Sequence, residues 1–126
     1  MKIKRFYDEV YKIPFIIVPF ANETDLDHLK IDNLSEHYPI WGMTLEVKGE
    51  TKYTEGRGIY ILIKQEAIND MEDCVEVAIH ESFHAASMVL HSAGIELTED
   101  TEEVYAYYVT WVTRKVLGLV VKMENK

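Results

Sequence analysis

The spacing of apolar residues changes near the middle of the chain, and this change limits the folds that the chain can adopt. In the run 59–64, isoleucines at every second position alternate with Tyr60 and Leu62. Successive side chains of a β-strand point to opposite faces, so this run predicts a strand that is covered on both sides. From about residue 72, apolar positions recur every three or four residues, which predicts helices. The order predicts an α+β fold, in which a small, mostly antiparallel N-terminal sheet precedes two packed helices.

Two further segments of the first half have the composition of strands. Ile13 to Phe20 is a β-branched apolar run that contains Pro14 and Pro19. Proline cannot donate to a sheet hydrogen bond, so we expect this run to be an edge strand. Trp41 to Lys48 predicts another strand, and we expect Lys52 to Thr54 to pair back against it.

The second half predicts two helices. The first is expected from about Glu72 to Ser92, with Asn69 or Asp70 as its N-terminal cap and Gly94 just past its end. The second is expected to begin near Asp100. We expect its core stripe to consist of Val104, Tyr108, Trp111 or Val112, and Val116, and Gly118 to end or loosen it.

Length and charge exclude several classes of protein. With 126 residues, the chain is expected to form one domain over residues 1–126. Its 13 Lys and Arg against 22 Asp and Glu give a net charge of −9, which repels nucleic acid and anionic membranes and favours cations. The lone Cys74 allows no internal disulfide, and Pro14 to Ala21, the longest apolar run, is too short to span a bilayer. A cytoplasmic protein without a signal peptide is therefore expected.

His80, Glu81 and His84 form an H-E-x-x-H motif inside the first expected helix. At about 100° per residue, the two histidines lie about 40° apart around the helix and one turn apart along it. Both imidazoles can therefore reach one ion, and zinc suits imidazole ligands. Glu81 lies to one side, where it can take a proton from water without being a ligand. The other interpretation is a helix with two ordinary surface or core histidines.

A third ligand is needed, and the second helix offers it. Glu103 follows an acidic loop and shares one face with Tyr107, which is one turn further on. The alternative interpretation of Glu103 is the third position of a capping box that begins at Asp100. Glu102 is the alternative ligand. His91 lies about 10 Å beyond His84 along a continuous helix, so we expect it to be a surface or capping residue.

At these residues the sequence resembles the gluzincins, zinc peptidases with H-E-x-x-H on one helix and a glutamate ligand on the next. The resemblance implies a minimal zincin core, zinc ligands at His80, His84 and Glu103, and Glu81 as general base. Tyr107 stands where the family often has an aspartate that holds an imidazole. More closely, residues 77–115 resemble small zinc metallopeptidases of phage and prophage, with E-x-x-A-Y at Glu103 to Tyr107.

The motif predicts a zinc-dependent metallopeptidase whose substrate is a peptide or protein. Zinc would activate water and polarise the peptide carbonyl, with Glu81 as the proton acceptor. The reaction also needs a group that stabilises the oxyanion, and the sequence does not choose among Tyr107, Tyr105, Tyr53, Tyr60 and His37. The competing hypothesis is a non-catalytic protein that binds or inhibits a partner on the same scaffold, with a structural or vestigial metal site.

Overall fold

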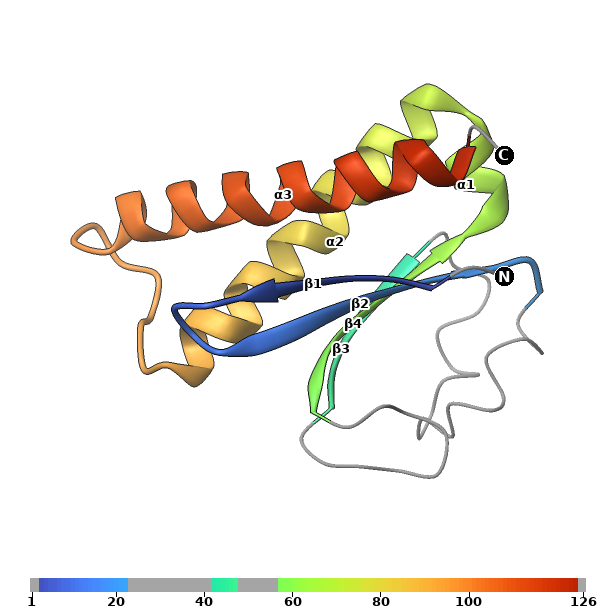
Figure 1. Ribbon diagram of the computed structural model, residues 1–126. Helices are drawn as coiled ribbons and strands as arrows, with labels where there is room; N and C mark the ends of the chain where they lie inside the picture. The colour runs from blue at the N-terminus through green and yellow to red at the C-terminus, as the bar shows by residue number, and fades with distance from the viewer. Residues whose placement is uncertain (1–2, 23–41, 48–56, 125–126) are drawn as a thin grey trace.

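The computed structural model describes residues 3–22, 42–47 and 57–124, and Figure 1 shows how their strands and helices are arranged. In chain order these are β1 (Lys4–Asp8), β2 (Ile13–Phe20), β3 (Gly42–Val47), β4 (Gly58–Lys64), α1 (Gln65–Asn69), α2 (Met71–Ser92) and α3 (Glu102–Glu124). The strands form one sheet, and α2 and α3 pack on the same face of it (Figure 1). The expected α+β class is confirmed for these residues.

The sheet is mixed, with the strand order β1-β2-β4-β3. β1 runs antiparallel to β2 and β3 runs antiparallel to β4, as expected for a mostly antiparallel sheet. The central pair differs, because β2 and β4 are parallel, with Phe15 opposite Ile59. A parallel pair needs a long crossover between its strands. Here β3 lies within that crossover and adds to the outer side of β4.

The prediction that Ile13 to Phe20 is an edge strand is wrong. β2 lies between β1 and β4, and the sequence pattern did not identify β1. Pro14 and Pro19 each stand one residue from an end of β2, where a missing N–H weakens the ladder little. In β1, Phe6 packs against the core while Arg5 and Tyr7 are exposed, so the strand has a weak apolar signal.

β4 is covered on both faces, as its alternation predicts. Ile59, Ile61 and Ile63 are at most 1% exposed and belong to the cluster between sheet and helices. Tyr60 and Leu62 belong to a second buried cluster on the opposite face. The strand that leads into the helices is therefore held from both sides.

The ends of α2 agree with the sequence. The Asp70 carboxylate accepts a hydrogen bond of 3.0 Å from the backbone N–H of Asp73, which is the expected N-terminal cap. Gly94 follows the helix with a φ of +84°, the left-handed conformation that glycine adopts at a helix C-terminus. Ala78, Ala85 and Ala86 are fully buried, and their small side chains let neighbouring elements approach α2 closely.

The core face of α3 differs in part from expectation. Val112 and Val116 are buried as expected, but Val104 is 41% exposed. Tyr105 is buried in its place, and its hydroxyl donates a hydrogen bond of 2.5 Å to the carbonyl of Ile95. Seven residues bring a helix almost back to the same face, so Tyr105 lies in line with Val112 and Val104 does not. The helix also continues through Gly118, which neither ends nor interrupts it.

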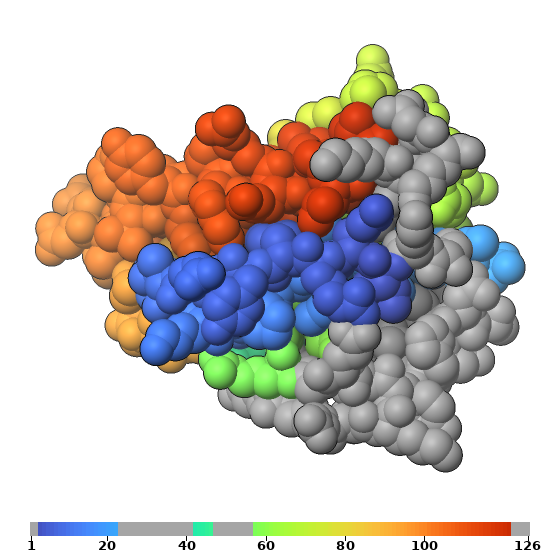
Figure 2. Space-filling model, in the orientation of Figure 1, coloured from blue at the N-terminus to red at the C-terminus, as the bar shows by residue number. Residues whose placement is uncertain are grey.

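A hydrogen bond joins the β1–β2 hairpin to α3. The hydroxyl of Tyr108 donates to the carboxylate of Asp8, a buried residue at the end of β1. Figure 2 shows the hairpin lying directly against α3 along the visible face of the molecule. The hairpin therefore closes one side of the core under the helix.

None of the helices in the described residues combines the length and the apolar character needed to cross a bilayer. Cys74 is buried within the core of the same region. The expected pairing of Lys52 to Thr54 lies outside the described residues.

Candidate metal centre

His80 and His84 form a close pair on the solvent-facing side of α2. Their Nε2 atoms are 3.2 Å apart, and their rings meet edge to face with centroids 4.8 Å apart. The His80 side chain is 67% exposed, and His84 is also exposed. The i, i+4 spacing of the motif therefore brings both ring nitrogens to one place that solvent reaches.

The spacing of the two nitrogens fits a shared zinc ion. Zinc binds histidine nitrogen at about 2.0–2.1 Å with tetrahedral angles, which puts two such nitrogens about 3.3 Å apart. The observed 3.2 Å is close to this value. At this distance one Nε2–H can also donate to the other nitrogen when no ion is bound. The pair is thus suited to occupy two of the four positions around zinc.

Glu81 faces the sheet rather than the solvent. Its side chain is 7% exposed, and its Oε2 lies 3.9 Å from Nε2 of His80. Its Oε1 accepts a hydrogen bond of 2.7 Å from the hydroxyl of Thr44 on β3. One carboxylate oxygen is therefore bound to the sheet, and the other lies beside the imidazole pair.

The described residues do not supply a third ligand to the pair. Across residues 3–22, 42–47 and 57–124, no three or more His, Cys, Asp and Glu side chains are grouped so that they could hold one metal ion. Glu102 and Glu103 are both exposed in the first turn of α3. Glu103 lies nine residues before the buried Val112, on the opposite face of the helix. The assignment of Glu103 as a ligand, with Glu102 as the alternative, remains a prediction.

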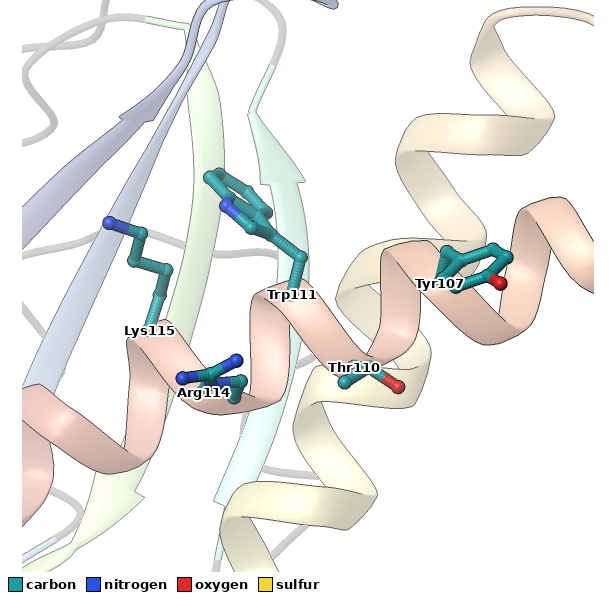
Figure 3. A pocket seen from close by; sticks show the side chains of 5 residues that line it. All are labelled: Tyr107, Thr110, Trp111, Arg114 and Lys115. Carbon is teal, nitrogen blue, oxygen red and sulfur yellow. The ribbon is translucent and has the colours of Figure 1, made fainter.

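Tyr107 lines a hollow on the surface of α3, whereas the histidine pair lies on α2. It is 73% exposed and lines an open hollow of about 510 Å³ whose described lining residues all come from α3. Figure 3 shows Trp111 and Lys115 extending to one side of the helix and Thr110 pointing to the other. None of the motif residues is among the described residues that line this hollow, and a role of Tyr107 at the motif stays a prediction.

The other residues named from the sequence have varied surroundings. The hydroxyl of Tyr105 donates its hydrogen bond to the carbonyl of Ile95. Tyr60 is buried on the side of the sheet that faces away from α2. Tyr53 and His37 lie outside the described residues. His91 is exposed in the last turn of α2, as expected for a surface or capping residue.

Thr44 is the residue of this site that the sequence analysis missed. It is 8% exposed on β3 and lies 37 positions before Glu81 in the chain. A threonine in a strand is common and gives no sign of its partner. The sequence indicated only that it belongs to the strand expected over Trp41 to Lys48.

We compared the chain with family models, with curated proteins and with solved structures, and none of these comparisons gave a match.

Proposed function

We propose that this chain is a minimal zinc-dependent metallopeptidase of gluzincin type, which hydrolyses peptide bonds in a peptide or protein substrate. The observation that carries the proposal is the 3.2 Å separation of the Nε2 atoms of His80 and His84. Two imidazoles so placed are the two zinc ligands that the H-E-x-x-H motif supplies, and the carboxylate beside them on the same helix is its general base.

In the proposed reaction, His80 and His84 would hold zinc through their Nε2 atoms, with Glu103 as the expected third ligand and Glu102 as the alternative. Bound zinc would polarise the peptide carbonyl and make water more acidic. Glu81 accepts the proton of the attacking water at Oε2, the oxygen that Thr44 does not bind. The same carboxyl group then gives the proton to the leaving amine.

Zinc binding is the first test. Protein without a histidine tag is loaded with zinc, and the metal is counted by elemental analysis. We expect one zinc per chain, lost in His80→Ala and His84→Ala and kept in His91→Ala, a control on the exposed end of the same helix. A stoichiometry that the first two substitutions leave unchanged would exclude this site.

The third ligand can be tested in the same way. Glu103→Gln and Glu102→Gln differ only in which carboxylate is lost. The ligand variant should lose more than the roughly 10- to 100-fold in zinc affinity that loss of an outer-shell partner costs. The other variant should bind zinc as the wild type does, and wild-type affinity in both variants would exclude both residues.

Hydrolysis is tested with Glu81→Gln, which keeps a side chain of the same shape. This variant should retain zinc and lose about 100- to 10,000-fold in turnover on a cleaved peptide. Full activity of the variant would rule out Glu81 as the general base.

The burial of Glu81 favours a second candidate function. Its carboxylate is bound to the sheet and its side chain is only 7% exposed, as in a site that is held for structure. A non-catalytic protein that binds a partner would then carry a structural or vestigial metal site. Capture of a stoichiometric partner that stays intact, together with no peptide hydrolysis by the zinc-loaded wild type, would favour this function.

We also propose a cytoplasmic location. Cys74 is the only cysteine of the chain and is buried, so the chain cannot form an internal disulfide of the kind that oxidising compartments favour. Fractionation of cells that express the full chain would test this location.

A further inference from the structure

We infer that Thr44 is a positioning residue for Glu81, and that Gly42 leaves the space in which Thr44 reaches it. The inference rests on the proposed function and adds two residues of β3 to the site. These residues come from a different part of the chain than the motif, since Thr44 and Glu81 are 37 positions apart.

The contact between Thr44 and Glu81 is short and buried. The Thr44 hydroxyl lies 2.7 Å from Oε1 of Glu81 and 3.1 Å from its backbone carbonyl oxygen. The single hydroxyl proton can serve one acceptor, and the carboxylate is both the nearer and the stronger. Thr44 is 8% and Glu81 5% exposed, so water does not readily replace this bond.

The bond to Thr44 leaves the two oxygens of Glu81 in different environments. With Oε1 held at β3, Oε2 is directed toward the imidazole pair and lies 3.9 Å from Nε2 of His80. A carboxylate that transfers a proton works best when it is held in one position, because small misplacements lower the rate steeply. Thr44 supplies this restraint without occupying the oxygen that faces the pair.

Gly42 is needed for β3 to approach α2 so closely. A Cβ at this position would lie 3.0 Å from Cγ of Glu81, 3.0 Å from Cγ1 of Val77 and 3.1 Å from the backbone oxygen of Leu62. A backbone oxygen in the sheet cannot move away cheaply, so the added group would push against the Glu81 side chain or α2. Either movement lengthens the bond between Thr44 and Glu81.

The simpler interpretation is that Thr44 is a strand-forming residue whose hydroxyl happens to have an acceptor. Under that interpretation Thr44→Val, which keeps the branched shape, affects stability alone. Under the positioning role it also lowers turnover, and Thr44→Ser, which keeps the hydroxyl, restores it.

The contact between Thr44 and Glu81 can be tested by unfolding experiments, without an activity assay. Urea unfolding of the metal-free full chain is measured for the wild type, Thr44→Val, Glu81→Met and the double variant. We expect the two single effects to be non-additive by about fivefold or more in the unfolding equilibrium constant. Additive effects would overturn the inference and leave the proposed function intact.

The use of the contact is tested by peptide hydrolysis with zinc-loaded protein. We expect Thr44→Val and Gly42→Ala to lower kcat by about 10- to 100-fold, with zinc stoichiometry and KM unchanged, and Thr44→Ser to recover most of the rate. Thr113→Val is the matched control, since that hydroxyl donates within α3, to the carbonyl of Val109 at 2.7 Å.

The kinetic outcomes separate the two proposals. A wild type that cleaves and a Thr44→Val variant that cleaves at the same rate would overturn the positioning role alone. A zinc-loaded wild type that cleaves no peptide would overturn the proposed function and any catalytic use of Thr44, while non-additive unfolding would still identify the contact.

Discussion

Removal of the Tyr108 hydroxyl is expected to destabilise the fold by about 2 kcal/mol. Asp8 is 4% exposed. One of its oxygens accepts from the backbone N–H groups of Val10 and Tyr11, at 2.7 and 3.2 Å, and the other accepts from Tyr108. Tyr108→Phe leaves that second oxygen without this donor, and a hydrogen bond to a charged group contributes about 1.5–3 kcal/mol.

The ring of residue 108 should stay in place, so the variant isolates the hydrogen bond. Tyr108 stacks on Trp111 with centroids 5.7 Å apart and meets Tyr11 edge to face at 5.3 Å. Phenylalanine keeps both contacts and opens no cavity. Unfolding entropy of about 2.1 cal/mol/K per residue then gives a decrease of about 8 °C in Tm for 126 residues.

The pH dependence of this loss provides a second check. Burial, together with the hydrogen bond to Asp8 and the charge of Asp8, raises the pKa of Tyr108 far above its usual range. In the unfolded chain tyrosine ionises near pH 10, so the contribution of Tyr108 is fully present below about pH 9 and is lost as pH rises beyond 10. The difference between wild type and Tyr108→Phe should therefore shrink above about pH 10.

Urea unfolding followed by circular dichroism at pH 7 and at increasing pH measures both effects. Tyr7→Phe is the control, because Tyr7 is 50% exposed on β1 and should change stability by less than about 0.5 kcal/mol. Equal stability of Tyr108→Phe and wild type at pH 7 would refute the importance of the bond. A difference that stays constant above pH 10 would refute the explanation of the raised pKa.

Three further substitutions test the packing of α2 and β4. Ser82 is buried and its hydroxyl has no hydrogen-bond partner among the described residues. Ser82→Ala should therefore leave the free energy of unfolding within about 0.5 kcal/mol of wild type or raise it. A loss above about 1 kcal/mol, measured by urea unfolding, would mean that the hydroxyl is hydrogen-bonded. At Gly58 a Cβ would lie 2.7 Å from Cδ1 of Ile16 and 2.9 Å from the carbonyl oxygen of Pro14. Gly58→Ala should therefore lower the free energy of unfolding by about 1–3 kcal/mol. An unchanged Tm would contradict this close approach. At Gly94 an added Cβ would have no neighbouring atoms, but the alanine would have to adopt a φ of +84°. Gly94→Ala should therefore lower the free energy of unfolding by about 1 kcal/mol through backbone strain alone. A stability equal to wild type would show that α2 ends differently.

The local features of α2 could be predicted from the sequence because they depend on residues near one another in the chain. The cap at Asp70, the left-handed Gly94 and the shared face of His80 and His84 all follow from helical geometry. The alternation in β4 was equally informative, since each face of that strand has its own apolar set. These predictions are confirmed in the described residues.

Strand partners could not be predicted in the same way. The two prolines suggested that β2 lies at an edge, but their positions near its ends allow neighbours on both sides. β1 has too few apolar residues to be recognised alone and is stabilised by pairing with β2. The parallel pairing of β2 with β4 depends on a long connection whose path no local pattern encodes.

The sequence by itself determined the candidate metal centre up to its histidine pair, because a spacing of four residues in a helix fixes where two side chains lie. Only the tertiary structure decided that Glu81 faces β3, that Thr44 binds it, and that Asp8 and Tyr108 join the hairpin to α3. These bonds link residues 37 and 100 positions apart. They form only when the sheet and the helices pack together, and the packing depends on the combined burial of many side chains.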